Sequence, residues 1–304
     1  MTRNGRQPTD AGLALLTGGS AGELMAAVLS AAGGRLLRWA PTQVDHQPGR
    51  HTTVSYSAQV RWVDGSMTGE TLGASSGRLP EGVARLSDGD TEIGMWRFPF
   101  DPDLPALPVA CDHERMRQLV EGAGLGVGGD AVRLRIRAYR PRRRAVIEVA
   151  APGGGRVFVK VVRPHRARGL HERHRLADAA GAAVPASLGW ADDGLVVLAG
   201  LPGRTLREML VADGMVALDP NSVLEVLDSL PNTLATGERR RTWGQRAGHY
   251  AEVIAAAAPE LGTRARAVAE AVNHDGPEGP ALPVHGDLYE SQLLMQGGRV
   301  SGLL

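Results

Sequence analysis

The side chains best suited to chemistry lie near the end of the chain, in the segment 285–292 (HGDLYESQ). Asp287 offers a carboxylate that can accept the proton of a hydroxyl group. Gln292 follows and offers an amide oxygen, a ligand type that Mg²⁺ accepts. A third candidate, Lys160, stands inside the apolar run 157–162 (VFVKVV), where a charged group is costly unless it is paired.

Each candidate also has a purely structural explanation, and the residues alone leave both open. The tripeptide at 285–287 has the composition of an ordinary tight turn before a strand. Lys160 could stand at the end of a strand with its ammonium group in solvent, which is the commoner arrangement for a lysine taken alone. The elements around these residues therefore have to decide between the explanations.

The segments around Lys160 have the pattern of an antiparallel sheet followed by helices. Alternating and β-branched residues predict strands at 131–139, 145–150, 157–162 and 195–199, with a helix at 165–180. Further helices are predicted at 205–212, 221–229, 237–259 and 263–273, before a Pro- and Gly-rich linker at 276–283. A β-rich part joined to a helical part predicts two lobes, with a ligand in the cleft between them.

The first 110 residues have the pattern of a separate small α+β unit. Residues 1–20 are polar and rich in glycine and are expected to be loose, whereas 23–32 is expected to be a short helix. Strands are predicted at 52–63 (TTVSYSAQVRWV) and 66–72, joined by an Asp-Gly turn. The proline-rich run 101–105 then breaks regular structure.

Composition restricts the classes of function. Apolar residues make up 43% and charged residues 22% of the 304 residues, so the chain can bury a core. The 34 Lys and Arg nearly balance the 33 Asp and Glu, and aromatic residues are few, so a nucleic-acid partner is not indicated. One cysteine and no apolar run of about 20 residues indicate a cytoplasmic protein without a membrane partner. The oligomeric state is not indicated.

Taken in order, these features resemble the aminoglycoside phosphotransferase and choline kinase family. Its catalytic loop has the pattern H-G-D-x-x-x-x-N, and its hinge resembles residues 195–206 (LVVLAGLPGRTL). The resemblance covers residues 131–304 and implies an α+β, protein-kinase-like two-lobe fold. It places a β-rich N-lobe and hinge at 111–201 and a helical C-lobe at 202–304, after an N-terminal unit at 1–110 like that of maltokinase-like relatives. The implied activity is Mg²⁺-dependent phosphoryl transfer from ATP or GTP to a small-molecule hydroxyl.

The resemblance gives each candidate a role. Asp287 becomes the catalytic carboxylate that receives or orients the acceptor hydroxyl, and Lys160 holds the α- and β-phosphates. Glu172, on the helix after the lysine, would pair with Lys160. The alternative is that Glu172 lies on a solvated helix face and pairs with Arg168 or Arg175.

The remaining nucleotide contacts are expected at the hinge and in the first hairpin. Backbone groups of Ala199, Gly200 and Leu201 would bind the adenine edge, although a strand, a Pro-Gly turn and an N-cap explain this segment locally. No G-x-G-x-x-G lies between the first two strands. In the loop found there, Arg142 and Arg143 would either neutralise phosphates or belong to a solvated basic hairpin.

Two departures from the family pattern bear on activity. Gln292 stands where the family has Asn, so the expected Mg²⁺ ligand has its amide oxygen one methylene further out. The strand at 298–304 stops where the family's second metal-binding aspartate is due, which predicts a truncated chain, either a fragment or a natural short form, with impaired transfer. The alternative function is a non-catalytic nucleotide-sensing or regulatory module. The acceptor is open among antibiotics, sugars, choline-like alcohols and homoserine-type compounds.

Overall fold

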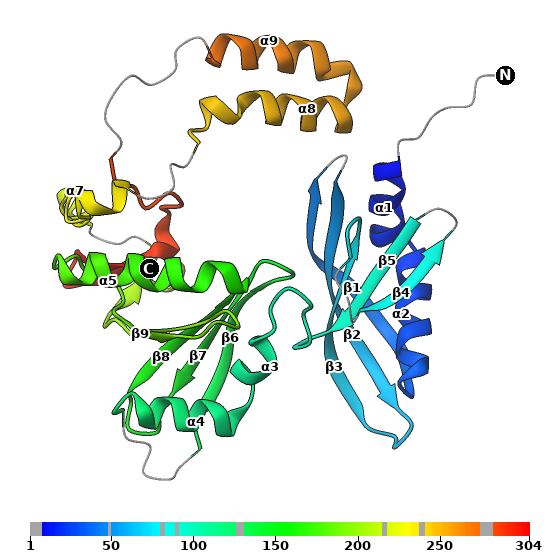
Figure 1. Cartoon of the computed structure of the whole chain (residues 1–304), viewed down its shortest axis with the longest axis horizontal. Helices are drawn as coiled ribbons and strands as arrows, with labels where there is room; N and C mark the ends of the chain where they lie inside the picture. The colour runs from blue at the N-terminus through cyan, green and yellow to red at the C-terminus, as the bar shows by residue number, and fades with distance from the viewer. Residues whose placement is uncertain are drawn as a thin grey trace. The chain divides into compact units, whose positions relative to one another are not determined.

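The computed structural model (Figure 1) describes residues 8–47, 50–79, 83–88, 91–125, 131–214, 218–236, 241–273 and 282–304. The chain divides into two compact units. The first contains residues 1–108, 139–145 and 243–276, and the second contains 109–138, 146–242 and 277–304. Both mix helices with antiparallel strands, so the predicted α+β class is confirmed. The predicted boundaries at residues 110 and 201 stay predictions.

The N-terminal part of the first unit is a five-stranded antiparallel sheet covered by two helices. The strand order is β1-β2-β3-β5-β4. Its elements are α1 (Pro8–Thr17), α2 (Ser20–Ala31), β1 (Gly34–Gln47), β2 (His51–Trp62), β3 (Met67–Ser76), β4 (Ala84–Asp88) and β5 (Thr91–Arg97). Tyr56 on β2 is fully buried and its hydroxyl donates to the Leu16 carbonyl oxygen at 2.6 Å, which fastens α1 to the sheet.

The helix α1 corrects the expectation that residues 1–20 are loose. Leu15 and Leu16 are buried in the core that the two helices form with the sheet, together with Met25 and Val54. A helix this short is marginal by itself, and packing of its apolar side stabilises it. Its sequence pattern alone was too weak to predict it.

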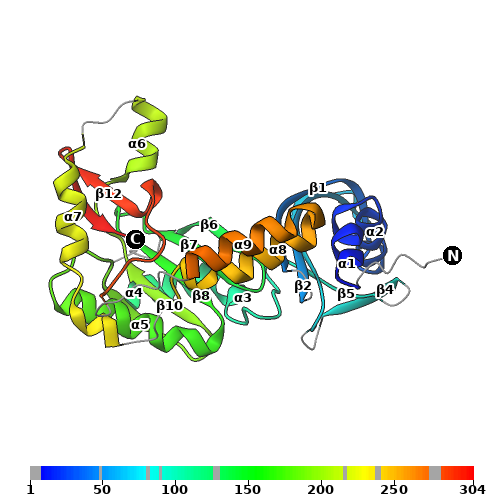
Figure 2. The same cartoon turned by 90° about the horizontal axis from the view of Figure 1, so that it is seen from above.

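The same unit includes a helical hairpin from a later part of the chain. Helices α8 (Ala247–Ala257) and α9 (Gly262–Asn273) lie side by side in both views (Figures 1 and 2). Short 3-10 turns precede each of them, η2 (Gly244–Arg246) and η3 (Pro259–Leu261). The helix predicted at 237–259 is therefore shorter than expected at its start, while residues 237–240 lie outside the described part of the chain.

The second unit contains the sheet that carries Lys160. Its strand order is β6-β7-β8-β10-β9, and its main helix, α5, comes between β8 and β9 in the chain. The elements, of which residues 107–108 and the hairpin tip 139–145 belong to the first unit, are α3 (Leu107–Ala110), α4 (His113–Gly122), β6 (Arg133–Arg140), β7 (Arg144–Ala150), β8 (Arg156–Val162), α5 (Pro164–Ala179), β9 (Ser187–Trp190) and β10 (Leu195–Ala199). Alternate residues of β7 and β8 are fully buried on one face, as the two-residue period of a strand requires, and the residues between them, Lys160 included, are mostly only partly buried on the other face.

A second, three-stranded sheet in this unit includes the strands that follow residues 285–287, here called the HGD segment. The elements are β11 (Arg204–Thr205), α6 (Leu206–Asp213), α7 (Pro220–Asp228), η1 (Asn232–Thr236), η4 (Glu290–Gln292), β12 (Leu293–Gln296) and β13 (Arg299–Leu303). Thr205 caps α6 through a capping box with Glu208, so the hinge turn ends in a well-defined helix start. Leu206, Leu293 and Leu303 share one buried cluster, which joins α6 to the sheet.

Among the described residues, no single helix has the length and apolar character to cross a membrane. The consecutive segments 11–17 and 20–31 meet these criteria only when they are taken together, and they are bent by 68°.

Candidate active site

Lys160 lies in the middle of a strand, on the face that a helix covers. Its neighbours two residues away along β8, Phe158 and Val162, pack against the buried cluster that Ala167 of α5 forms with residues of β10. Because residues two apart in a strand point to the same face, the Lys160 side chain also faces α5. The cross-strand partner of Lys160 is Val196, a member of the same cluster.

Lys160 is also the one lysine in the whole sequence. All the other residues counted as Lys or Arg are arginines. A chain that otherwise uses arginine for its cations keeps a lysine at this strand position. Arginine is bulkier and cannot replace the compact ammonium group of lysine at a confined site. This compositional signal was available in the sequence and was missed.

Glu172, the predicted partner of Lys160, lies on the outer side of α5. Its side chain is 52% exposed, and its carboxylate accepts from Arg168 Nε at 2.8 Å, one turn earlier on the helix. This is the pair that the alternative explanation of Glu172 predicts. The pairing of Glu172 with Lys160 stays a prediction, and the position of Glu172 on the helix gives it no support.

The inner side of α5 carries two histidines instead. His171 Nδ1 is 2.9 Å from Ser187 Oγ, and His174 Nδ1 is 2.8 Å from the Pro185 carbonyl oxygen. Burial lowers the pKa of His174 to about 4, and the positive charge of Lys160 is the next largest cause. His174 is therefore neutral at pH 7 and lies within electrostatic reach of the lysine. Sequence reasoning assigned no role to either histidine.

The predicted hinge follows β10 directly. The Ala199 N–H donates to the Ala186 carbonyl oxygen at 2.9 Å, and the Gly200 N–H donates to the Arg156 carbonyl oxygen at 3.1 Å. A Cβ atom at Gly200 would lie 2.8 Å from that same oxygen, so the close approach needs glycine. These two N–H groups already donate hydrogen bonds within the protein, so fewer backbone donors are left for an adenine edge.

The third hinge residue also has a partner within this unit. The Leu201 carbonyl oxygen accepts from Arg156 Nη2 at 2.9 Å. Adenine contacts at Ala199, Gly200 and Leu201 stay predictions, and the bonds described here limit how they could be made.

The HGD segment forms a defined turn. Gly286 has a φ of +82°, a left-handed conformation that favours glycine, and Asp287 after it is exposed. His285 Nε2 lies 2.8 Å from the Leu304 carbonyl oxygen, and because a carbonyl only accepts, this nitrogen carries the proton. The bond ties the turn to the end of β13 and leaves the Asp287 carboxylate accessible.

Gln292 ends the 3-10 turn that follows Asp287. Its backbone N–H donates to the Tyr289 carbonyl at 2.8 Å, and its own carbonyl accepts from the Leu304 N–H at 3.0 Å. No cluster of three or more His, Cys, Asp or Glu side chains in the described ranges is placed to hold a metal ion. Mg²⁺ needs only one or two protein oxygens when nucleotide phosphates supply others, so the oxygen of Gln292 fits this ion in kind.

The hairpin of β6 and β7, the first hairpin of the predicted N-lobe, carries Arg142 and Arg143. Its tip belongs to the first unit. Arg142 has a φ of +60°, and its guanidinium group donates to Asp103 at 2.9 Å, to Ser75 Oγ at 3.0 Å and to the Arg78 carbonyl at 3.2 Å. It would have to give up these bonds to hold a phosphate. The role of Arg142 in phosphate binding stays a prediction, and these bonds give it no support.

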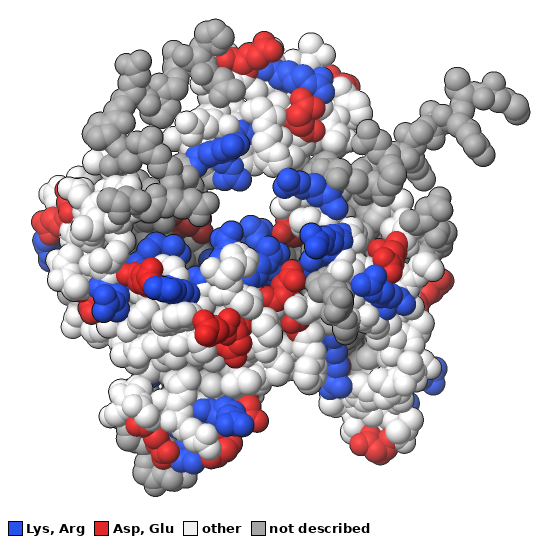
Figure 3. Space-filling view, in the orientation of Figure 1, with Lys and Arg blue, Asp and Glu red and all other residues white. Residues whose placement is uncertain are grey.

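Arg143 is more weakly held. It is 55% exposed and pairs with Asp45 of β1 at 3.0 Å. Its role in nucleotide binding stays a prediction. Basic and acidic side chains are interspersed on the face shown in Figure 3, in keeping with the net charge of +1.

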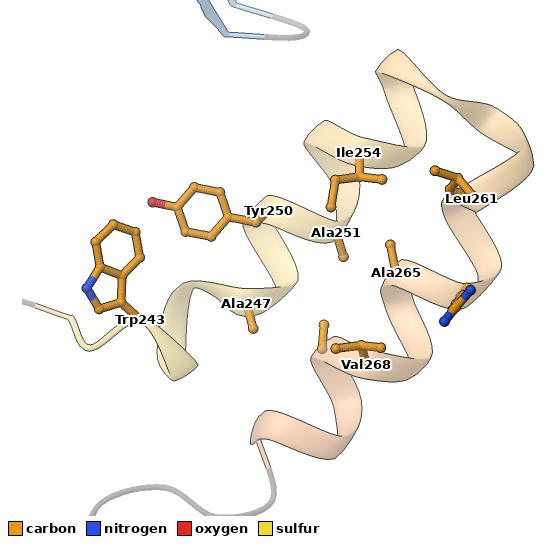
Figure 4. Close-up of a pocket in the computed structure, with 10 residues that line it drawn as sticks. Trp243, Ala247, Tyr250, Ala251, Ile254, Leu261, Ala265 and Val268 are labelled. Atoms are coloured by element: carbon orange, nitrogen blue, oxygen red, sulfur yellow. The ribbon is translucent and has the colours of Figure 1, made fainter.

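An apolar groove lies between α8 and α9 (Figure 4), and none of the residues predicted for the site is among those that line it. Its volume is about 490 Å³. Trp243 and Tyr250 stack at one end with ring centroids 5.7 Å apart, and Ile254 and Leu261 line the other end. With Arg264 as its one charged lining residue, the groove could hold apolar groups but carries no catalytic set.

Comparisons with known proteins find similar solved structures and no match to a protein family or a curated protein. One similar solved structure is the macrolide 2'-phosphotransferase MphH from Brachybacterium faecium, without ligand, at 21% identity and a TM-score of 0.40. Another is a type I macrolide 2'-phosphotransferase, at 19% identity and a TM-score of 0.38. Each alignment covers 62% of this chain and 70% of the other.

Proposed function

We propose that the protein is a phosphotransferase of the aminoglycoside phosphotransferase type, which uses ATP or GTP to phosphorylate a hydroxyl group of a small molecule. The observation that carries the proposal is that Lys160 and Asp287 belong to the same compact unit. Lys160 is the one lysine of the sequence and lies on a strand face covered by α5. Asp287 stands exposed after a left-handed glycine, in a turn anchored by His285.

In the proposed mechanism each of these side chains has one role. The Lys160 ammonium group binds the α- and β-phosphates and offsets their charge. Asp287 accepts the proton of the acceptor hydroxyl, or orients that hydroxyl toward the γ-phosphoryl group. Mg²⁺, held by Gln292 and by nucleotide oxygens, would neutralise charge that develops on the phosphates.

Binding and transfer test the proposal together. Binding of MgATP and MgGTP is measured by calorimetry, and transfer is measured with labelled nucleotide against aminoglycosides, macrolides, sugars, choline and homoserine. Lys160→Ala is expected to weaken nucleotide binding, and Asp287→Ala is expected to abolish transfer while nucleotide still binds. Asp192→Ala, an exposed aspartate between β9 and β10, is the matched control. Equal transfer by Asp287→Ala and the control would refute the proposed mechanism.

A non-catalytic nucleotide-sensing module is the second candidate. The exposed position of Glu172 and its pair with Arg168 favour it, because a catalytic kinase-like site normally pairs its lysine with that glutamate. Nucleotide binding that depends on Lys160, with no transfer to any acceptor and no effect of Asp287→Ala, would support the module.

A further inference from the structure

Arg156 lies at the point where β8 meets the predicted hinge. Its backbone carbonyl accepts from the Gly200 N–H at 3.1 Å, and its Nη2 donates to the Leu201 carbonyl oxygen at 2.9 Å. The stem of the side chain also lies against the hinge, because a Cβ atom at Gly200 would be 2.6 Å from Cγ of Arg156. The side chain of Arg156 is therefore held along the backbone at which we expect the base of the nucleotide to bind.

The same residue shares a strand face with Lys160. Arg156, Phe158 and Lys160 are alternate residues of β8, so their side chains point to one side of the sheet. The guanidinium carbon of Arg156 is 6.0 Å from the centre of the Phe158 ring. Four residues of a strand span about 13 Å, a length comparable with that of an extended nucleotide that has its base at Arg156 and its phosphates at Lys160.

A guanidinium group at the hinge changes which base fits there. The amino group of adenine would need a carbonyl acceptor at the hinge, and the Leu201 carbonyl oxygen already accepts from Arg156. A guanidinium group has five N–H donors in a rigid fork, and the bond to Leu201 uses one of them. Guanine presents two neighbouring acceptors, O6 and N7, that match such a fork. Adenine carries an amino group in place of O6, which would set donors against donors.

We propose that Arg156 is a specificity-determining residue of the nucleotide site: its guanidinium group donates to O6 and N7 of guanine and so selects GTP over ATP as the phosphoryl donor. The Leu201 carbonyl and the Phe158 ring hold the guanidinium group at the hinge. This role rests on the proposed function, because it requires a nucleotide with its base at the hinge and its phosphates at Lys160. It adds the identity of the base, which the proposed function leaves open.

Three triphosphates distinguish the contacts to the base. Binding of ATP, GTP and inosine triphosphate, each with Mg²⁺, is measured by calorimetry. The base of inosine triphosphate shares O6 and N7 with guanine and lacks its 2-amino group. We expect GTP and inosine triphosphate to bind with similar affinity, and both at least about fivefold more tightly than ATP, as a bidentate contact to guanine predicts. ATP that binds as tightly as GTP, or inosine triphosphate that binds as weakly as ATP, would overturn the role of Arg156.

Two substitutions of Arg156 test whether the guanidinium group causes the preference. Arg156→Met keeps a long apolar side chain without donors, and should bring the affinities for GTP and ATP to within about twofold of each other. Arg156→Lys keeps the charge but loses the planar fork, and should restore little of the preference. Arg168→Met, which removes an exposed arginine of α5, is the matched control and should keep the wild-type ratio. An unchanged ratio in Arg156→Met would overturn the role.

Failure of this role and failure of the proposed function give different results. A wild type that binds ATP and GTP equally would contradict the base preference and leave the phosphotransferase proposal standing. A wild type that binds no triphosphate would overturn both. Thermal unfolding checks that each variant is folded, and the comparison of the three triphosphates on the wild type decides the role if Arg156→Met does not fold.

Discussion

Two aspartates, one in each unit, show how the fold separates a structural carboxylate from a candidate catalytic one. Asp101 in the first unit is 3% exposed and accepts from the Tyr139 hydroxyl, the Arg142 N–H and the Asp103 N–H at 2.8, 2.8 and 2.9 Å. Asp287 in the second unit is exposed after its glycine turn. A buried and fully bonded carboxylate supports structure, whereas an exposed one held by a rigid turn can meet a substrate.

The surroundings of Asp101 extend this contrast. Trp96 Nε1–H donates to the Tyr139 hydroxyl at 2.9 Å, and Tyr139 in turn donates to Asp101. Burial raises the pKa of Asp101, and its hydrogen bonds oppose that rise. Burial raises the pKa of Tyr139 as well. A continuous series of hydrogen bonds, from Trp96 through Tyr139 to Asp101, thereby fastens the tip of the hairpin of β6 and β7 to the region of the N-terminal sheet.

The largest effect should come from Asp287→Asn. We expect phosphoryl transfer to fall by about 10²- to 10⁴-fold, the usual contribution of a positioned proton acceptor. The free energy of unfolding should change by less than about 0.5 kcal/mol, because the side chain is exposed. Steady-state kinetics and urea unfolding measure the two quantities. A stability loss without a rate loss would reverse the contrast between the two aspartates.

The opposite result is expected for Asp101→Ala. Removal of this acceptor leaves three partly buried donors without this partner and should lower the free energy of unfolding by about 3 kcal/mol. Urea unfolding of the variant is compared with that of Asp192→Ala, in which an exposed aspartate is removed. Nucleotide affinity measured well below the unfolding transition should be unchanged. An unchanged free energy of unfolding in Asp101→Ala would show that the hydrogen bonds to Asp101 are dispensable for stability.

A smaller, pH-dependent effect is expected from His174. Its folded-state pKa of about 4 lies below its ordinary value of 6.5, so between these pH values the unfolded chain binds a proton that the folded chain does not. The stability of the wild type should therefore fall as the pH drops from about 6.5 to about 4, by about 2 kcal/mol from this group. The difference in unfolding free energy between wild type and His174→Gln isolates the effect. A difference that does not vary with pH would contradict a buried, neutral His174.

The smallest expected effect is that of Tyr139→Phe. The ring and its contact with Phe98, at a centroid distance of 5.0 Å, are kept, while the bonds to Asp101 and Trp96 are lost. We expect a loss of about 1 kcal/mol in the free energy of unfolding. Calorimetric unfolding measures it. A loss as large as that of Asp101→Ala would show that the Tyr139 hydroxyl, and not the Asp101 carboxylate, contributes most to the stability of these hydrogen bonds.

The sequence predicted the local elements of the second unit well. β10 has the predicted limits, and β8 and α5 begin and end within one residue of the prediction. Their signals are local: an apolar run bounded by turns, and a charged segment opened by Pro164. β1 was missed because residues 34–47 include a proline and lack clear alternation, and pairing with β2 along its length, with two register shifts, holds it in the sheet.

The candidate site was harder to predict because it depends on direction and on distant partners. The charged sequence of α5 has too weak an apolar stripe to show which side faces the sheet, so the exposed position of Glu172 could not be predicted. Arg142 has its partners at Ser75 and Asp103, far away in the sequence, and no local pattern predicts such bonds. By contrast, Gly286 is a local signal for a turn, because glycine readily adopts the left-handed conformation that it has here.

The central claim is that the ammonium group of Lys160 binds the phosphates of a nucleotide, and its ¹⁵N signal tests this claim most directly. The labelled protein is titrated with MgATP and MgGTP, and with adenosine as the control that lacks phosphates. We expect a saturable shift of the lysine signal with at least one triphosphate and none with adenosine. An unchanged lysine signal while either triphosphate binds at saturation would contradict the account.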